Sequence, residues 1–484
     1  MKKIDDFKKS RAMGPILLLM AQYISKIMGP FISLFVVRYL GTEDYGLYAS
    51  AIAITSFLLF LPDFGLQQAA LKMSVNSRMK ISELIKLTLY TSIIYSCITY
   101  IILFIWLTSF QYDNTIKIIA YMSGISFFRA SFLMVMTTLL QIKQDYSRLA
   151  VNNLFINSSQ WITTIFCILL NVDVLQLVIW PQFVSLLIAA LLLLWEGKRF
   201  KVFKKITVSL VNKPIKELIG QSLEFGTAGS MFQLYHQSDA AILSAFRTPV
   251  EVGYYSVAFR ITELVNFFPT VLFNQVLYPK FFEWSKTNRE KYLKFYKLLN
   301  KIMILLGFFA TSIILMFSNE LTSIVFGSEE IISSTILCIM IIAIPFRFFS
   351  SSVGAILTTD NLIRKKIKIQ SIIAIINVGL NFLLIPIHGG IAAALLIIVT
   401  DGLLMLGYLL TLNKYVTKSH ISRKLLCQLP ILVGIVVFSI LFNHFELIYR
   451  FLAGIIIFIV ISIILINNFD RDEIFEIKSL FKRK

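Results

Sequence analysis

The chain has 484 residues, of which 57% are apolar and 15% are charged, and its mean hydropathy is +0.77. Soluble domains are about 45–50% apolar and about 25% charged, so this composition excludes a water-soluble, a fibrous or a disordered protein and indicates an integral membrane protein. The net charge of +19 would favour nucleic-acid binding if the cations formed one surface, but they occur in short clusters between apolar runs.

Fourteen apolar runs are long enough to cross a bilayer, which takes about 20 residues of helix. Charged or turn-forming clusters separate them, and we place the spans at residues 13–37, 47–70, 87–110, 115–140, 149–170, 174–195, 217–245, 254–279, 300–317, 334–358, 369–386, 391–412, 425–442 and 449–466. The first run has no small-residue cleavage site, so we interpret it as a retained span rather than a signal peptide. An all-α polytopic membrane protein is therefore expected.

The basic residues are distributed unequally between the two sides of the predicted membrane. Cytoplasmic loops carry the excess of Lys and Arg. With the N-terminus inside, the cytoplasmic segments hold 38 of the 46 basic residues, and the opposite segments hold only Arg38, Lys117, Arg247 and Arg450. We therefore predict that both termini are cytoplasmic and that the number of spans is even. This distribution explains the positive charge without nucleic acid.

Two predicted cytoplasmic stretches, 281–301 and 469–484, mix basic with aromatic or aliphatic residues at roughly helical spacing. We expect them to lie on the membrane surface against anionic lipid headgroups, with solvated helix ends as the alternative. The four cysteines, at 97, 167, 338 and 427, show no spacing typical of a metal site or a disulfide framework, so we interpret them as buried small hydrophobic residues. The predicted loops are too short to form a catalytic domain. We therefore expect no catalytic residue, no metal and no cofactor.

An internal repeat relates the loops after the first and the seventh span. Residues 44–48 (DYGLY) match residues 251–255 (EVGYY) in the pattern acidic, any, Gly, any, Tyr. Both copies join an outgoing helix to an incoming one, so the repeat is parallel and spans six helices. The predicted organisation is an N-terminal lobe at 1–198, a basic cytoplasmic linker at 199–216, a C-terminal lobe at 217–412, two further helices within 425–466 and a basic tail at 467–484. Parallel-repeat transporters bind substrate between such lobes.

Nine charged side chains lie inside the predicted spans and away from their ends, where charges are costly and usually face a cavity or a partner. They are the cations Lys26, Arg129, Arg260 and Arg347 and the acids Asp63, Glu224, Asp239, Glu263 and Asp401. Guanidinium and ammonium groups suit a diphosphate, so the four cations are candidate contacts of an anionic substrate. A carboxylate in a low-dielectric cavity can take up and release a cation as access alternates, so the five acids are candidates for coupling to H⁺ or Na⁺.

Some of these charges can instead form structural ion pairs. Asp63 and Arg129 lie at similar predicted depth, so they are candidates to pair with each other. Asp239 and Arg260 also lie at similar depth, while Arg260 and Glu263 share one helix face. Both interpretations, functional and structural, therefore stay open for these five residues.

Three of the charges, Lys26, Arg347 and Asp401, have no obvious partner in the sequence. We regard them as the stronger functional candidates. His236 lies one turn before Asp239 and is either a proton relay or a polar residue at a helix end. Prolines inside the first, second, eighth and tenth spans are expected to bend or break those helices.

Two N-terminal segments, RYLGTEDYGLYA (38–49) and LPDFGLQQAALK (61–72), resemble the opening of the polysaccharide transporter family, the flippases of O-antigen, capsule and exopolysaccharide units. In that family an RxLGxxxYGxYA turn follows the first helix and a DFGL-like segment ends the second. LLIPIHGGIAAA (383–394) is similar to a later family turn, although GGIAAA departs from the more usual GIxGAA. The turn residues that carry the resemblance are Gly41, Tyr45, Gly46, Tyr48 and Gly65, with Gly253 and Tyr255 in the second lobe.

The resemblance implies the fold of the multidrug, oligosaccharidyl-lipid and polysaccharide exporter superfamily: two six-helix lobes related by a pseudo-twofold repeat, plus two C-terminal helices. It implies that the protein moves undecaprenyl-diphosphate-linked oligosaccharide from the cytoplasmic to the outer leaflet of the bacterial plasma membrane. Transport would follow alternating access and use an H⁺ or Na⁺ gradient. A polysaccharide polymerase and a chain-length regulator of the same pathway are the expected protein partners.

Three alternatives to this function remain. A flippase of a lipid-linked peptidoglycan precursor or of teichoic acid would share the fold. A multidrug exporter is less favoured, because its commonly cationic substrates would be repelled by the cations predicted at mid-depth. A polysaccharide polymerase, which is an enzyme, would usually carry a large outer loop with catalytic residues, and no such loop is predicted.

Overall fold

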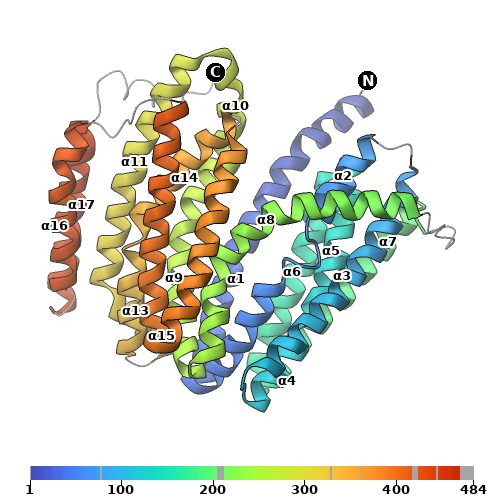
Figure 1. Ribbon diagram of the computed structural model, residues 1–484, viewed down its shortest axis with the longest axis horizontal. Helices are drawn as coiled ribbons and strands as arrows, with labels where there is room; N and C mark the ends of the chain where they lie inside the picture. The colour runs from blue at the N-terminus through green and yellow to red at the C-terminus, as the bar shows by residue number, and fades with distance from the viewer. Residues whose placement is uncertain are drawn as a thin grey trace. The chain divides into compact units, whose positions relative to one another are not determined.

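The structure is a computed structural model that describes residues 2–76, 79–203, 212–327, 330–360, 362–416, 423–442 and 445–468. Every regular element in these residues is a helix (Figure 1). The helices are α1 (Lys2–Leu58), α2 (Leu66–Asn76), α3 (Ile81–Ser109), α4 (Asn114–Ser123), α5 (Ile125–Ile142), α6 (Tyr146–Leu169), α7 (Val174–Arg199), α8 (Asn212–Phe246), α9 (Pro249–Val271), the π-helix η1 (Leu272–Leu277), α10 (Tyr278–Thr287), α11 (Arg289–Met316), α12 (Ser318–Phe326), α13 (Ile331–Ile341), α14 (Ile344–Thr359), α15 (Ile363–Tyr415), α16 (Arg423–Phe442) and α17 (Leu447–Asn468).

Eight stretches of the described chain are long and apolar enough to cross a membrane. They are Met20–Leu58, Ile81–Ser109, Asn114–Ile142, Val174–Arg199, Arg289–Met316, Ile331–Thr359, Ile363–Tyr415 and Leu447–Ile464. Some hold more than one predicted span, since 363–415 contains both 369–386 and 391–412. The predicted spans outside these stretches lie on α6, α8, α9 with η1, and α16. The all-helical polytopic architecture is therefore confirmed, and the number of fourteen crossings stays a prediction.

Glycines divide the two longest helices. Gly41 in α1 has φ 72° and Gly389 in α15 has φ 60°, both in the region that favours glycine because it has no Cβ. Each residue therefore ends one helical rod and starts the next. Pro345 stands in the first turn of α14, where its missing N–H is tolerated, and the tenth predicted span is accordingly split into α13 and α14.

Several helices are capped at their N-terminal ends by short polar side chains of the preceding connection. Asp113, Asp145 and Asp173 each accept a hydrogen bond from a backbone N–H in the first turn of α4, α6 and α7, respectively. Hydrogen bonds from Thr115 also lower the pKa of the fully exposed Asp113 carboxyl. Asn288 caps α11 in the same way, by accepting from the Lys291 N–H at 2.9 Å. These short polar residues fix where the helices begin.

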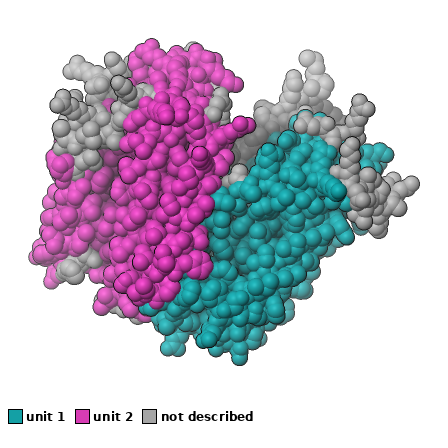
Figure 2. All heavy atoms as spheres, viewed as in Figure 1, with its two compact units in different colours: residues 1–253 teal, residues 254–484 magenta. Residues whose placement is uncertain are grey.

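The helices group into two compact units, residues 1–253 and 254–484 (Figure 2). In the first unit, α1 packs against α4, α6 and α8, and α7 packs against α5 and α6. In the second unit, α11 packs against α14, α16 and α17, and α14 packs against α15. The lobes and the linker that the sequence repeat predicts divide the chain differently from these two units and stay a prediction. Residues 204–211 of that linker lie outside the described residues.

Each unit has buried apolar cores and an exposed apolar exterior. In the second unit one core joins η1, α10, α11, α14, α15, α16 and α17. On α15 large side chains such as Ile375, Leu383 and Leu410 are more than half exposed. A helix that is apolar on all sides is typical of a protein surrounded by lipid. Cys97 is exposed on α3, so its predicted burial is wrong; α3 presents an apolar exterior there, beside Ile94 and Ile98.

The predicted surface stretch 281–301 is part of the folded protein. Its aromatic residues Phe281, Tyr292, Phe295 and Tyr296 are buried in the second-unit core rather than free to meet lipid. The aromatic side of this stretch therefore faces the core and not lipid, because helical spacing alone cannot tell the two apart, while contact of its basic residues with lipid headgroups stays a prediction. The second such stretch, 469–484, lies outside the described residues.

Candidate substrate and cation sites

Three of the predicted intramembrane charges meet within the second unit. Arg347 on α14 donates from Nε to Asp401 Oδ2 on α15 at 2.5 Å. Its Nη1 donates to Glu263 Oε1 on α9 at 3.2 Å. The side chains of Asp401 and Arg347 are 2% and 15% exposed, while that of Glu263 is 31% exposed. One guanidinium therefore bridges two carboxylates from two other helices.

The local structure explains how this cation cluster (Glu263, Arg347, Asp401) forms. α14 begins at Ile344 with Pro345 in its first turn, and Arg347 lies in that same turn. Gly389 divides α15, so Asp401 lies on the rod that follows the division. The formal charges of these three side chains sum to −1, so the cluster is a candidate place for a monovalent cation.

A second predicted cation, Arg129 on α5, has a different environment. Its Nε is buried and has no hydrogen-bond partner, and no ion pair joins Arg129 to any described side chain. Arg129 is only partly buried as a residue, but a buried polar nitrogen without an acceptor is costly, so Arg129 is a candidate to contact an anion. Arg129 is therefore the best candidate of the first unit for contact with an anionic substrate.

Asp63 lies where the second predicted span is interrupted. After α1 ends at Leu58 the chain turns through residues 59–65 before α2 begins, and Asp63 Oδ1 accepts from the Gln67 N–H at 2.9 Å. Among the described side chains no ion pair joins Asp63 to Arg129, so the structural pairing considered for these two residues does not form. Asp63 instead caps α2, because the freed N–H groups at that helix start need acceptors.

The turn residues of this interruption pack closely on α8. Gly65 has φ 77°, and a Cβ at this position would lie 2.6 Å from the Ser222 carbonyl oxygen. Ser222 Oγ donates to the Phe64 carbonyl oxygen at 2.7 Å. Where a helix is interrupted and other protein elements surround it, its backbone groups are exposed without touching lipid. Transporters form binding sites from such interrupted helices.

The two copies of the sequence repeat touch each other. A Cβ at Gly253 would lie 3.2 Å from Gly46 Cα, and one at Gly46 would lie 2.5 Å from the Pro249 carbonyl. Tyr45 is fully buried beside Tyr48, with ring centroids 6.0 Å apart. The repeated glycines are therefore needed for close backbone approach at these turns. Tyr255 is fully buried in the second unit.

The remaining predicted residues have varied surroundings. Lys26 lies on α1 but outside the residues whose side chains the structure describes. Arg260 on α9 makes no hydrogen bond or ion pair with a described side chain, and Glu224 on α8 is exposed. Asp239 on α8 is 4% exposed, next to Ser238, whose Oγ lies 3.4 Å from Asp239 Oδ1. Its pairing with Arg260 would join two different units and stays a prediction.

The sequence did not reveal two buried charged groups outside the predicted mid-membrane positions. Glu196 on α7 is fully buried and accepts from Asn152 Nδ2 at 3.1 Å, with Arg148 Nη1 at 3.6 Å. Arg450 on α17 donates to Glu320 and to the Met316 carbonyl oxygen at 3.0 Å. The signal for Glu196 is its helical spacing from the buried Ser185, Ala189 and Leu193.

No group of His, Cys, Asp and Glu in the described residues could hold a metal ion. The family described as polysaccharide biosynthesis protein matches residues 12–285, more than half of the chain. The chain belongs to this family. A curated relative, the probable low-salt glycan biosynthesis flippase Agl15 of Haloferax volcanii, is 30% identical over 169 residues. This match covers 33% of the chain and only about a third (34%) of the length of that relative.

Two solved structures place this member of the polysaccharide biosynthesis family in a known fold. The lipid II flippase MurJ in an inward closed conformation has a TM-score of 0.71 and 15% identity, covering 92% of this chain and 98% of that one. An inward-facing multidrug resistance MATE family transporter of the MOP superfamily has a TM-score of 0.62 and 16% identity, and the match covers 83% of this chain and 100% of that one. The predicted exporter fold is confirmed. These relatives are flippases and transporters, in agreement with the expectation of a transporter rather than an enzyme.

Proposed function

We propose that this family member is a flippase that moves undecaprenyl-diphosphate-linked oligosaccharide repeat units from the cytoplasmic to the outer leaflet of the plasma membrane. The family and the glycan flippase among its relatives support a lipid-linked glycan as cargo. The uneven distribution of Lys and Arg supports cytoplasmic termini. The units would serve O-antigen, capsule or exopolysaccharide, with a polymerase and a chain-length regulator acting after export.

The observation that carries this proposal is the buried Arg129 Nε without an acceptor. The diphosphate of the cargo would supply the missing acceptors, because a guanidinium presents a planar fork that matches phosphate oxygens. Lys26 and Arg260 are proposed as further contacts with the anionic cargo. Binding energy would thus come from the diphosphate that all such cargoes share, which leaves the sugars free to vary.

We assign Arg347 to the coupling site rather than to the cargo, because two carboxylates already engage its guanidinium. In this proposal the carboxylates of the cation cluster bind one H⁺ or Na⁺. Cation binding there would favour the return of the unloaded carrier under alternating access. Asp63, Glu224 and Asp239 remain candidates for the same role.

Mass spectrometry of lipids from cells depleted of the protein tests the proposed cargo. A membrane-impermeant sugar-modifying probe is applied to intact spheroplasts before extraction. We expect undecaprenyl-diphosphate oligosaccharide to accumulate and to be shielded from the probe. Accumulated lipid that is fully labelled would assign the protein to a step after translocation, and accumulation of a peptidoglycan or teichoic-acid precursor would overturn the cargo.

The coupling role has its own test, in which Asp401→Asn keeps the hydrogen-bonding shape but removes one acid from the cation cluster. Translocation by this variant is expected to become independent of the H⁺ or Na⁺ gradient. Unchanged gradient-driven transport would exclude Asp401 from coupling without affecting the proposed cargo.

A further inference from the structure

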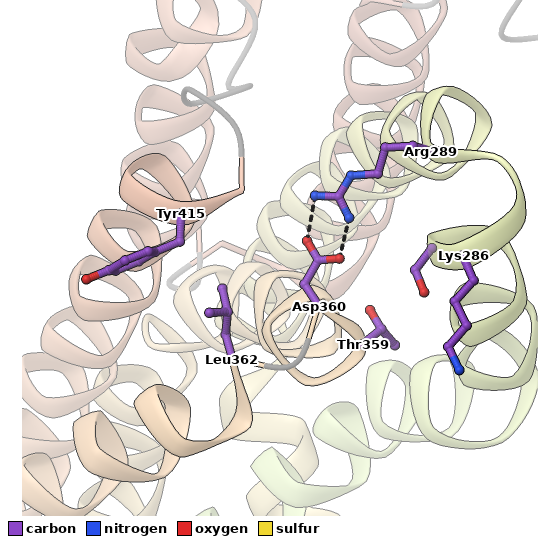
Figure 3. A pocket seen from close by; sticks show the side chains of 7 residues that line it. Lys286, Arg289, Thr359, Asp360, Leu362 and Tyr415 are labelled. Carbon is purple, nitrogen blue, oxygen red and sulfur yellow. Dashed lines mark hydrogen bonds and ion pairs between the residues drawn. The ribbon is translucent and has the colours of Figure 1, made fainter.

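A cavity of about 410 Å³ opens in the second unit where several helices start or end. It lies at the end of α10, the start of α11, the connection between α14 and α15, and the end of α15. Its lining residues are Ser285, Lys286, Arg289, Thr359, Asp360, Leu362 and Tyr415 (Figure 3). None of them belongs to the cation cluster or to the proposed cargo contacts. The predicted topology puts this pocket at the cytoplasmic surface of the membrane.

The only acid in the lining is already neutralised. Asp360 accepts two hydrogen bonds from Arg289, one from Nη1 to Oδ1 and one from Nη2 to Oδ2 at 2.9 Å (Figure 3). The Asp360 side chain is 8% exposed and the Arg289 side chain is 47% exposed, so the carboxylate is largely buried while the guanidinium also reaches water. With two cations and one acid, the lining carries one excess positive charge, which belongs to Lys286.

Lys286 makes no ion pair with any described side chain. Its acidic neighbour along α10, Glu283, does not line the pocket, and Glu290 is paired with Lys294 at 2.9 Å. At the opposite wall, the ammonium groups of Lys365 and Lys414 lie against the Tyr415 ring. The two lysines therefore add positive charge to the rim of the pocket, and no described acid compensates them.

Helix dipoles do not reverse this sign. The starts of α11 and α15 bring partial positive charge to the pocket, and the ends of α10, α14 and α15 bring partial negative charge. Because these contributions oppose one another, the lysine side chains determine the net attraction. An anion with several oxygen acceptors is the ligand that such donors prefer.

We propose that this pocket binds a phosphate group, and that the source of this phosphate is the headgroup of an anionic phospholipid. The volume is at the lower end of the range of about 300–1,000 Å³ for small-molecule pockets, which suits a glycerophosphate-sized group and not an oligosaccharide. The cytoplasmic leaflet is rich in anionic lipids that attract basic residues near the membrane surface. A bound headgroup would link the connection between α10 and α11 to both ends of α15.

The proposal is tested with the purified full-length protein in a zwitterionic detergent, by measuring the binding of dioctanoyl phosphatidylglycerol. Dioctanoyl phosphatidylcholine, which has the same phosphodiester but no net charge, serves as the comparison. We expect Lys286→Gln to raise the Kd for phosphatidylglycerol about tenfold, with little change in thermal stability because Lys286 is exposed. Lys294→Gln is the matched control, since it removes the same charge from a neighbouring position outside the pocket and is expected to leave the Kd unchanged.

Three outcomes would overturn the proposal. Equal weakening by Lys286→Gln and Lys294→Gln would show a general effect of surface charge. Equal affinity for phosphatidylcholine would show that the phosphodiester and acyl chains, not the net anionic charge, decide binding. Tighter binding of inorganic phosphate than of the lipid, with the same dependence on Lys286, would keep a phosphate site but exclude the lipid as its source.

Discussion

Replacement of Arg347 by methionine removes the guanidinium that holds two carboxylates together. We expect Arg347→Met to destabilise the protein strongly, since Asp401 and Glu263 would then face each other without their counter-charge. The net charge of the cation cluster would change from −1 to −2. A second substitution, Asp401→Asn, returns the net charge to −1 and should therefore recover part of the lost stability.

The structure sets the size of the effect. Two unit charges 3.2 Å apart, the distance between Arg347 Nη1 and Glu263 Oε1, attract by about 5 kcal/mol at an effective dielectric constant of about 20. Partial exposure of Glu263 reduces this value. Loss of one partner from a buried ion pair typically costs about 3–5 kcal/mol. We therefore expect a loss of about 3 kcal/mol for Arg347→Met and a smaller loss for the double variant.

Thermal unfolding of the purified variants in one detergent measures this order. The expected order of midpoints is wild type, then Arg347→Met with Asp401→Asn, then Arg347→Met alone. Arg450→Met combined with Asp401→Asn is the matched control, because Arg450 contacts Glu320 instead of the cation cluster. A double variant as unstable as Arg347→Met alone, or less stable, would contradict the electrostatic reasoning.

Three further predictions concern other sites. Arg129→Gln is expected to lower the rate of glycan translocation about tenfold and Arg129→Lys to lower it less, because lysine keeps the charge but not the planar fork; equal rates for all three proteins would refute the role of the guanidinium. Gly65→Ala should lower stability by about 1–3 kcal/mol in thermal unfolding, since its Cβ meets the Ser222 carbonyl; Gly29→Ala, which meets no atom within 4 Å, should not. Arg450→Met should make α17 more sensitive to limited proteolysis, because it leaves Glu320 without its partner; unchanged cleavage would show that apolar packing alone holds α17.

The sequence predicts the helices well because their composition follows a single rule, the exclusion of charge from lipid. It also identified Gly41 and Gly65, whose family motifs coincide with backbone turns at positive φ. Hydropathy does not show that α1 and α2 are separated by residues 59–65, because the apolar run continues through the turn, but Pro62 predicts a bend or break in this span and lies inside the interruption. Hydropathy alone indicates that a segment is buried in lipid or in protein, but it does not indicate where a helix breaks.

The charged residues show the same limit more clearly. Arg347 and Asp401 were each identified as candidates without an obvious partner, yet they contact each other. They are separated by 54 residues along the chain and by a division of α15 at Gly389, which no depth count along the helices takes into account. The sequence does not predict the pairing of Arg289 with Asp360, because both residues lie in predicted loops, where charged side chains are common. Pairing depends on which helices are neighbours, and this information comes only with the fold.

Reconstitution of the purified protein into liposomes tests the proposed transport most directly. The cargo is the undecaprenyl-diphosphate oligosaccharide isolated from depleted cells, incorporated in both leaflets, and an impermeant sugar-modifying reagent reports the accessible fraction. We predict that the wild-type protein makes nearly all of the lipid accessible, whereas Arg129→Gln leaves about half of it protected during the assay. Equal protection in protein-free liposomes and in liposomes with the wild-type protein would contradict a flippase.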